Sequence, residues 1–211
     1  WMGENYEGII FCFGRVIINN ELSLYEKAFL KLLETPARLQ QSYKTFMHIH
    51  NAFEIGSIDA TAFRNQTRAL FGLSKLHDAL FDAAWNALLL DIPAHRVALL
   101  KSLNPRYRLF LLSNTNEIHY EKYCSDFQKN FPGLSLESLF EDAFFSFMMG
   151  LRKPDPEIFR TVIRECVLNP DRTLFIDDTL EHVQAARSCG LHAYHLKPGE
   201  EIQSVIGKLL L

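Results

Sequence analysis

Leu174-Phe175-Ile176-Asp177-Asp178 is the stretch that decides the fold. Three apolar residues lead into two adjacent carboxylates, which is the pattern of a buried strand that ends in a polar site. A second apolar run, residues 8–13, is rich in Ile and Phe, is too short for a helix and is bounded by glycines. It also predicts a buried strand, and we expect both runs to lie in one sheet.

Strands and helices alternate along the chain after Pro93. The predicted strands are 108–113, 143–147, 173–177 and 192–196, and the predicted helices lie near 93–103, 117–129, 156–167 and 180–188. Such a series of βαβ units is typical of an α/β protein with a parallel sheet.

A long helical stretch separates the first predicted strand from this series. From about residue 23 to residue 90 the apolar residues recur at helical spacing, and strand signals are absent. Helix breaks and N-cap candidates divide the stretch into about four helices: breaks at Pro36, Gly56-Ser57 and Gly72, with Asp59 and Ser74 as N-caps.

The sequence therefore predicts two domains. Residues 1–19 and 91–211 form the α/β core, and residues 20–90 form an all-helical cap inserted after the first strand. We expect the linkers near 18–22 and 90–93 to act as hinges.

Composition excludes several classes of function. The chain has 211 residues, is 48% hydrophobic and carries a formal net charge of -3, with Lys and Arg scattered rather than clustered, so we expect no nucleic-acid partner. No apolar run approaches the ~18 to 20 residues that span a bilayer, so we expect no membrane partner. The four cysteines show no metal-binding spacing, which favours free thiols in a reducing cytoplasm.

Polar residues gather where the predicted strands end. Ligands of open parallel sheets bind outside the carboxyl ends of the strands. Cys12, Ser113 and the pair Asp177-Asp178 occupy such ends, and Lys153 follows a strand by a short turn that contains Gly150. We expect these residues to converge on one rim of the sheet.

Each of these segments has two interpretations. Ser113-Asn114-Thr115-Asn116 offers hydroxyl, amide and backbone N–H donors that suit a phosphoryl oxygen, or it is an ordinary helix N-cap. Lys153, beside Pro154, either neutralises a phosphoryl group or lies in a surface turn. Asp177 and Asp178 either hold Mg²⁺ or serve as a hydrogen-bonded residue and a helix cap.

The order and spacing of these segments resemble the haloacid dehalogenase superfamily over almost the whole chain. The resemblance implies a Rossmann-like, doubly wound parallel sheet with a helical cap after the first motif. It also implies that Ser113 binds the phosphoryl group, that Lys153 is a catalytic and substrate-binding residue, and that Asp177, Asp178 and the backbone carbonyl of Gly14 hold magnesium. The side-chain amide of Asn114 adds a further candidate donor to the phosphoryl group.

Cys12 stands where this family has its nucleophilic aspartate. A thiol is a soft ligand, so we expect a lower affinity for Mg²⁺. Lys153 is positioned to lower the thiol pKa and create a thiolate nucleophile, whereas the alternative is a cysteine that only packs in the core. Arg15 is also unexpected beside a metal site, because a guanidinium repels Mg²⁺ and attracts anions; its alternative is an orientation toward solvent.

These residues predict a haloacid-dehalogenase-like hydrolase, a Mg²⁺-dependent phosphatase of a small phosphorylated metabolite whose activity is impaired by Cys12. The alternative is a non-catalytic ligand-binding or interaction protein on the same fold. A dehalogenase is the third choice, because it also needs the missing aspartate and has less use for two metal-binding carboxylates. The eight histidines show no ligand pattern and are expected to be structural.

Overall fold

The sheet of this protein contains five parallel strands. The computed structural model describes residues 6–33 and 35–210, so residues 1–5 and 211 of the predicted core and residue 34 of the predicted cap lie outside the described residues. The strands are β1 Gly8–Phe11, β2 Arg108–Ser113, β3 Asp142–Phe145, β4 Thr173–Asp177 and β5 His192–His195. Their order in the sheet is β3-β2-β1-β4-β5. The predicted α/β class is confirmed.

Strand register brings the functional segments to one edge. Phe11, the last residue of β1, pairs with Leu111 on one side and with Ile176 on the other. Cys12 therefore follows β1 at the level where β2 approaches Ser113 and β4 ends at Asp177. Because all strands are parallel, their carboxyl ends share this rim.

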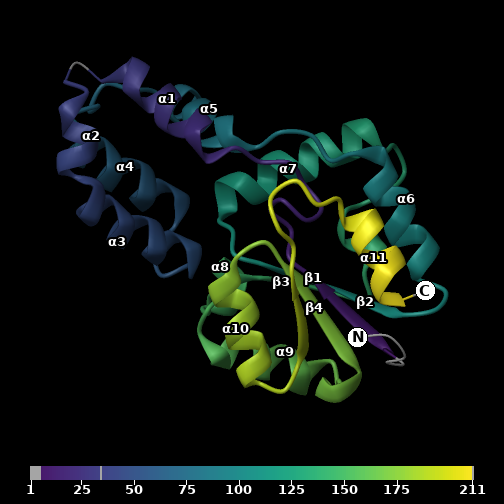
Figure 1. Ribbon diagram of the computed structural model, residues 1–211. Coiled ribbons are helices and arrows are strands. Elements are labelled where there is room, and N and C mark those ends of the chain that lie inside the picture. The colour runs from purple at the N-terminus through teal and green to yellow at the C-terminus, as the bar shows by residue number, and fades with distance from the viewer. Residues whose placement is uncertain (1–5, 34, 211) are drawn as a thin grey trace.

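Helices cover both faces of the sheet (Figure 1). Side chains alternate along β1, so Ile9 and Phe11 join one core cluster and Ile10 joins another. The first cluster includes residues of α6 Ala94–Leu103, α7 Glu117–Asn130 and α11 Ile202–Leu210, and the second includes residues of α9 Pro156–Glu165 and α10 Leu180–Ser188. Apolar residues on both faces explain the continuous apolar runs of the central strands.

The segment after β1 forms a group of helices that stands beside the sheet in Figure 1. It contains α1 Leu22–Leu32, α2 Ala37–Gln41, α3 Tyr43–Glu54, α4 Ala60–Phe71, α5 Asp78–Trp85 and the short 3₁₀ helix η1 Asn86–Leu88. Its core is aromatic, with Phe29, Phe53, Phe63, Phe81 and Trp85 buried against one another. We call residues 22–88 the cap helices. Within the described residues of this segment, no strand belongs to the sheet.

Two local predictions in this segment need correction, and one is confirmed. The described residues of the segment form five α-helices rather than about four, because the predicted second helix divides at Ser42 into α2 and α3. Ser74 is not an N-cap, since α5 starts at Asp78 after His77. Asp59 does cap α4, and its carboxylate accepts a hydrogen bond from the Ala62 N–H at 2.7 Å.

Strand β3 ends at Phe145, two residues before the predicted end of this strand. Residues 146 and 147 belong to the short helix α8 Ser146–Met149, which ends at Gly150 in the left-handed conformation. The Ser146 hydroxyl hydrogen-bonds the Thr115 backbone, which competes with continuation of the strand. The remaining short helices are η2 Glu137–Leu139 and η3 Pro170–Arg172, and α11 was not predicted. No helix in residues 6–33 and 35–210 has the length and apolar character needed to cross a bilayer.

The two linkers between the cap helices and the core run side by side. Asn20 and Leu89 form an antiparallel bridge. Backbone hydrogen bonds join Asn19 N–H to the Asp91 oxygen at 2.9 Å and Leu90 N–H to the Asn19 oxygen at 3.0 Å. The positions of the linkers agree with the predicted hinges, and the hinge motion itself stays a prediction.

The cap helices also contact the core near β3. Arg152 donates to the Asn51 side chain at 2.8 Å and pairs with Glu54 at 2.8 Å. Gly56 has a φ of +67°, and a Cβ at this position would overlap the backbone oxygen of Phe147. Gly56 is therefore required both by its conformation and by a close approach of the two backbones.

Replacement of Gly56 should test this contact. Gly56→Ala should lower the free energy of unfolding by more than the roughly 1–2 kcal/mol that a left-handed conformation costs an L-residue, because the new methyl group also displaces α8. Urea denaturation measures the change. Gly133→Ala is the matched control, since Gly133 has a φ of +83° and open space around it. Equal losses in the two variants would show that the contact with Phe147 does not matter.

Candidate active site

A buried lysine holds the rim of the sheet together. Lys153 Nζ lies 2.7 Å from Asp177 Oδ2, 3.1 Å from Cys12 Sγ and 2.8 Å from the backbone oxygen of Leu112. Lys153 and Asp177 are both completely buried. The interpretation of Lys153 as part of a surface turn is therefore wrong. Three segments that are distant in the sequence meet at this ammonium group, as expected from their strand ends.

Two polar contacts fix the loop that carries Lys153. The Asn114 side chain accepts a hydrogen bond from the Lys153 N–H and donates one to the Lys153 carbonyl, both at 2.9 Å. The Ser146 hydroxyl accepts from the Thr115 N–H at 2.9 Å and donates to the Thr115 oxygen at 3.0 Å. The Asn114 amide is thus already paired with the backbone of Lys153.

Asp177 is surrounded by donors. Besides Lys153, its carboxylate accepts from the Thr179 N–H at 2.8 Å and lies 3.1 Å from His182 Nδ1. Burial alone would raise the Asp177 pKa, but the charge of Lys153 and the hydrogen bond from His182 hold it below its usual range. Burial likewise opposes the charge of Lys153, and Asp177 raises the Lys153 pKa above its ordinary value. Both groups are therefore ionised.

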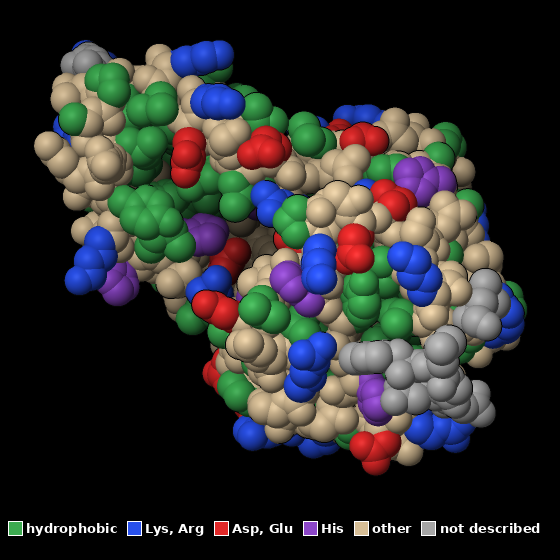
Figure 2. All heavy atoms as spheres, viewed as in Figure 1, with side chains coloured by type: hydrophobic (Ala, Val, Ile, Leu, Met, Phe, Trp, Pro, Cys, Tyr) green, Lys and Arg blue, Asp and Glu red, His purple; other side chains and the backbone are tan. Residues whose placement is uncertain are grey.

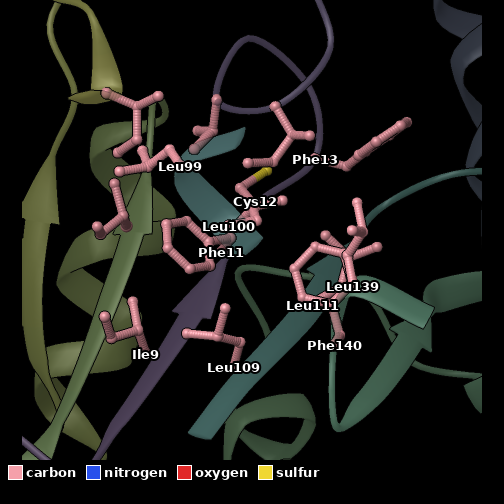
Figure 3. Close-up of a cluster of buried hydrophobic side chains, with 14 of the residues drawn as sticks. Ile9, Phe11, Cys12, Phe13, Leu99, Leu100, Leu109, Leu111, Leu139 and Phe140 are labelled. Atoms are coloured by element: carbon pink, nitrogen blue, oxygen red, sulfur yellow. The ribbon is translucent and has the colours of Figure 1, made fainter. Parts of the chain in front are cut away.

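Cys12 lies just beyond β1, among apolar side chains such as Phe11 and Leu100 (Figure 3). It is 8% exposed, and its N–H donates to the Ile176 oxygen at 2.9 Å. Burial and the negative charge of Asp177 raise the pKa of the Cys12 thiol to about 12, against a smaller lowering by Lys153. The raised pKa agrees with the alternative of a cysteine that packs in the core, because the charge of Lys153 is already matched by Asp177.

The candidate metal ligands fit magnesium only in part. One ligand atom each from Cys12, Asp177 and Asp178 lie within 4.8 Å of one another. The two carboxylates are hard oxygen donors of the kind that Mg²⁺ prefers, whereas the neutral thiol is not. Gly14 lies in the loop that follows Cys12, and its carbonyl stays a predicted ligand.

Ser113 opens toward a cavity between the sheet and the cap helices. The cavity has a volume of about 280 Å³, and its lining includes Ser113, Gly14, Tyr25, His50 and Trp85. Figure 2 shows a hollow between the two parts of the molecule, with hydrophobic side chains gathered on the cap side. The volume is just below the roughly 300–1,000 Å³ found for small-molecule sites, so it suits a small ligand.

Asn116, the last residue of the segment 113–116, is the N-cap of helix α7. The Asn116 side chain accepts from the His119 N–H at 3.1 Å and from Trp85 Nε1 at 3.3 Å. Asn116 therefore caps α7 and joins it to the cap helices, while Ser113 and Asn114 lie at the rim. The N-cap interpretation thus applies to Asn116, and phosphoryl binding by Ser113 and Asn114 stays a prediction.

His182 belongs to the site although the sequence analysis treated all histidines as structural. It lies five residues after Asp177, in the first turn of α10, with its ring against the carboxylate. The signal was available, because a helix that starts after Asp178 places a residue of its first turn over the preceding strand end.

The chain belongs to the haloacid dehalogenase-like hydrolase family, whose sequence profile matches residues 15–190. The D-ribitol-5-phosphate phosphatase of Bacteroides thetaiotaomicron is 27% identical over 197 residues, which cover 92% of this chain and 94% of that protein.

Solved structures agree with this membership. A HAD family enzyme from Bacteroides thetaiotaomicron superposes with a TM-score of 0.89 at 30% identity, over 96% of this chain and 99% of the other. A wild-type structure of that enzyme in complex with magnesium and inorganic phosphate gives a TM-score of 0.85 at 32% identity, over 95% and 98% of the two chains. A predicted HAD-like hydrolase from Porphyromonas gingivalis gives 0.86 at 28% identity, over 98% of each chain.

Removal of the buried cation should destabilise the fold. Lys153→Met leaves Asp177 buried without its partner, and we expect a loss of about 3–5 kcal/mol in the free energy of unfolding at pH 7. The pair stabilises the fold fully above the reference pKa of 3.8 of an aspartate, and this contribution is lost as the pH falls through the lower folded-state value.

Urea denaturation at pH 7 and pH 3 measures the free energy of unfolding. The loss caused by Lys153→Met should be smaller at pH 3 than at pH 7. Lys153→Met combined with Asp177→Asn should cost less than the sum of the two single changes. Additive costs would mean that the two side chains are not coupled.

The Cys12 thiol should resist alkylation. With a pKa of about 12, only about one thiol in 10,000 is ionised at pH 8. Iodoacetamide at pH 8, read out by mass spectrometry of peptides, should modify Cys12 in the unfolded chain but not in the native one, whereas the partly exposed Cys189 should react in both. Rapid native modification of Cys12 would contradict a protonated, buried thiol.

Proposed function

We propose that this protein is a phosphomonoester hydrolase by ancestry, dependent on Mg²⁺, with turnover impaired by Cys12. The observation that carries the proposal is the buried ammonium of Lys153, 3.1 Å from Cys12 and 2.7 Å from Asp177. The resemblance puts phosphoryl transfer beside Cys12, and a buried ammonium group at this distance from Cys12 supports that chemistry. The related phosphatase and the magnesium and phosphate complex of a related enzyme support the same chemistry.

The phosphoryl-binding residues of the proposed site are intact. Ser113 supplies a hydroxyl beside the cavity, and Lys153 supplies an ammonium group whose orientation is already fixed by its contacts with Asp177 and Leu112. We assign Asn114 a positioning role, since its amide holds the backbone of Lys153 on both sides. These groups do not require a carboxylate at position 12.

Magnesium would be held by Asp177, Asp178 and the carbonyl of Gly14. When bound, the ion neutralises negative charge on the phosphoryl oxygens. Asp177 is ionised and Asp178 is half-buried nearby, so hard donors for the ion are present. Cys12 contributes neither charge nor a hard oxygen, and we therefore propose that its presence lowers the affinity for Mg²⁺.

Position 12 limits the reaction. The attacking group of the family's reaction is a carboxylate oxygen, which is ionised at neutral pH. The Cys12 thiol is protonated, and no described side chain in contact with it has the free basic group needed to take its proton, because Asp177 is already paired with Lys153. The site thus retains the means to bind a phosphoryl group and lacks the means to attack it.

The substrate class follows from the cavity and from the relatives. We propose a small phosphorylated metabolite, with polyol phosphates as the first compounds to assay because a relative is a D-ribitol-5-phosphate phosphatase. Among the residues that the structure describes, no Lys or Arg lines the 280 Å³ cavity. A leaving group with a second phosphate would therefore find no countercharge there.

A non-catalytic ligand-binding protein is the second candidate. The protonated Cys12 favours it, since a site with intact phosphoryl donors and an inert thiol binds without turnover. The two candidates predict different responses to restoration of the carboxylate.

Restoration of the carboxylate should restore the reaction. Cys12→Asp should increase Mg²⁺-dependent hydrolysis of polyol and sugar phosphates by as much as ~10⁶-fold, the cost of removing a nucleophile from a cooperating site. Phosphate release measures the rate for both forms across a panel of esters.

Two controls isolate the carboxylate. Cys12→Asn has the shape of the aspartate without its charge and should stay inactive, and Asp177→Asn should abolish the restored activity. If the cysteine form turns over as fast as the aspartate form, Cys12 is itself a working nucleophile. If Cys12→Asp binds phosphate but hydrolyses nothing, the binding-protein candidate is favoured.

A further inference from the structure

Arg15 is held beside the proposed metal site by its own loop. Its φ of 58° lies in the left-handed region, which a side chain with a Cβ seldom adopts. The Arg15 N–H donates to the Ile18 oxygen at 2.8 Å, and Arg15 Nε donates to Asn20 Oδ1 at 3.2 Å. The backbone and the side chain of Arg15 are therefore both constrained by the residues that lead to the cap.

The constrained guanidinium lies next to Asp178. Arg15 Nη1 is 3.7 Å from Asp178 Oδ2, with the two side chains 46% and 22% exposed. The other carboxylate oxygen of Asp178 accepts a long hydrogen bond of 3.5 Å from the Thr179 hydroxyl. The alternative of a side chain directed only toward solvent is wrong for Arg15.

Of the two carboxylates, Asp178 is the one whose negative charge is not neutralised by Lys153. Asp177 is matched by Lys153, whose ammonium lies 2.7 Å from its carboxylate. Lys153, Arg15, Asp177 and Asp178 together have a net charge of zero. An arginine beside Asp178 thus removes the remaining attraction for a divalent cation.

We propose that Arg15 is a tethered counter-ion of Asp178 that competes with Mg²⁺ for this carboxylate. The inference rests on the proposed function, because it assumes that Asp178 is a magnesium ligand. Arg15 and Asp178 both line a second cavity of about 550 Å³, which gives the guanidinium room to move away when the ion binds. The magnesium affinity of this chain is then set by two residues, Cys12 and Arg15.

The competition is tested by direct measurement of Mg²⁺ binding with titration calorimetry at low ionic strength. Arg15→Gln, which removes the charge but keeps a Cβ, should increase the affinity about two- to fivefold, as expected for an exposed ion pair. Arg15→Lys should leave the affinity near that of the parent. The gain from Arg15→Gln should shrink as salt is added.

Two further variants separate the competing explanations. Arg15→Gly also relieves the backbone conformation, so an increase seen with Gly but not with Gln would overturn the proposal in favour of strain. Arg106→Gln removes an arginine that precedes β2, at the opposite end of the strand from the site, and controls for net charge. An equal gain from Arg106→Gln would also overturn the proposal.

The same titrations in the Cys12→Asp background separate this inference from the proposed function. If that form hydrolyses phosphate esters while Arg15→Gln leaves its Mg²⁺ affinity unchanged, the inference fails and the function stands. If affinity responds to Arg15 as described but no ester is hydrolysed, the function fails and the inference stands. If no form binds Mg²⁺, both are wrong.

Discussion

The ion pair between Lys153 and Asp177 is the interaction on which the rest of the site depends. Two opposite charges at 2.7 Å, both without solvent contact, are tolerated only because each finds further partners: Leu112 for the ammonium, Thr179 and His182 for the carboxylate. Leu112 lies in β2, whereas Thr179 and His182 follow β4. The Lys153 ammonium also contacts Cys12, 141 residues away in the chain, and so joins a third strand end to the pair.

This pair also decides the chemistry of Cys12. A lysine that is matched by a carboxylate has no surplus charge with which to ionise a thiol, so proximity at 3.1 Å does not produce a nucleophile. At the second carboxylate, the Arg15 guanidinium lies 3.7 Å from Asp178. Cys12 and Arg15, the two residues that the resemblance makes unexpected, thus both lie beside the charged groups of one rim.

The sequence predicted those elements whose signals are local. The limits of β2, β4 and α10 agree with the predicted ones, because apolar runs and helix starts mark them directly. The end of β3 was wrong because Phe144, Phe145 and Phe147 suggest a strand, whereas the bond between Ser146 and Thr115 is a tertiary contact. The pairing of Arg15 with Asp178 likewise depends on a three-dimensional neighbour that no periodicity reveals.

The paired linkers have a mechanical consequence. The two linkers, joined by hydrogen bonds at Asn19, Leu90 and Asp91, resist sliding past each other and separating. Asn20 lies in this ribbon and accepts a hydrogen bond from the Arg15 guanidinium. A rotation of the cap helices about the ribbon, which would also break the contacts of Arg152 with Asn51 and Glu54, would therefore move the charge that lies beside Asp178.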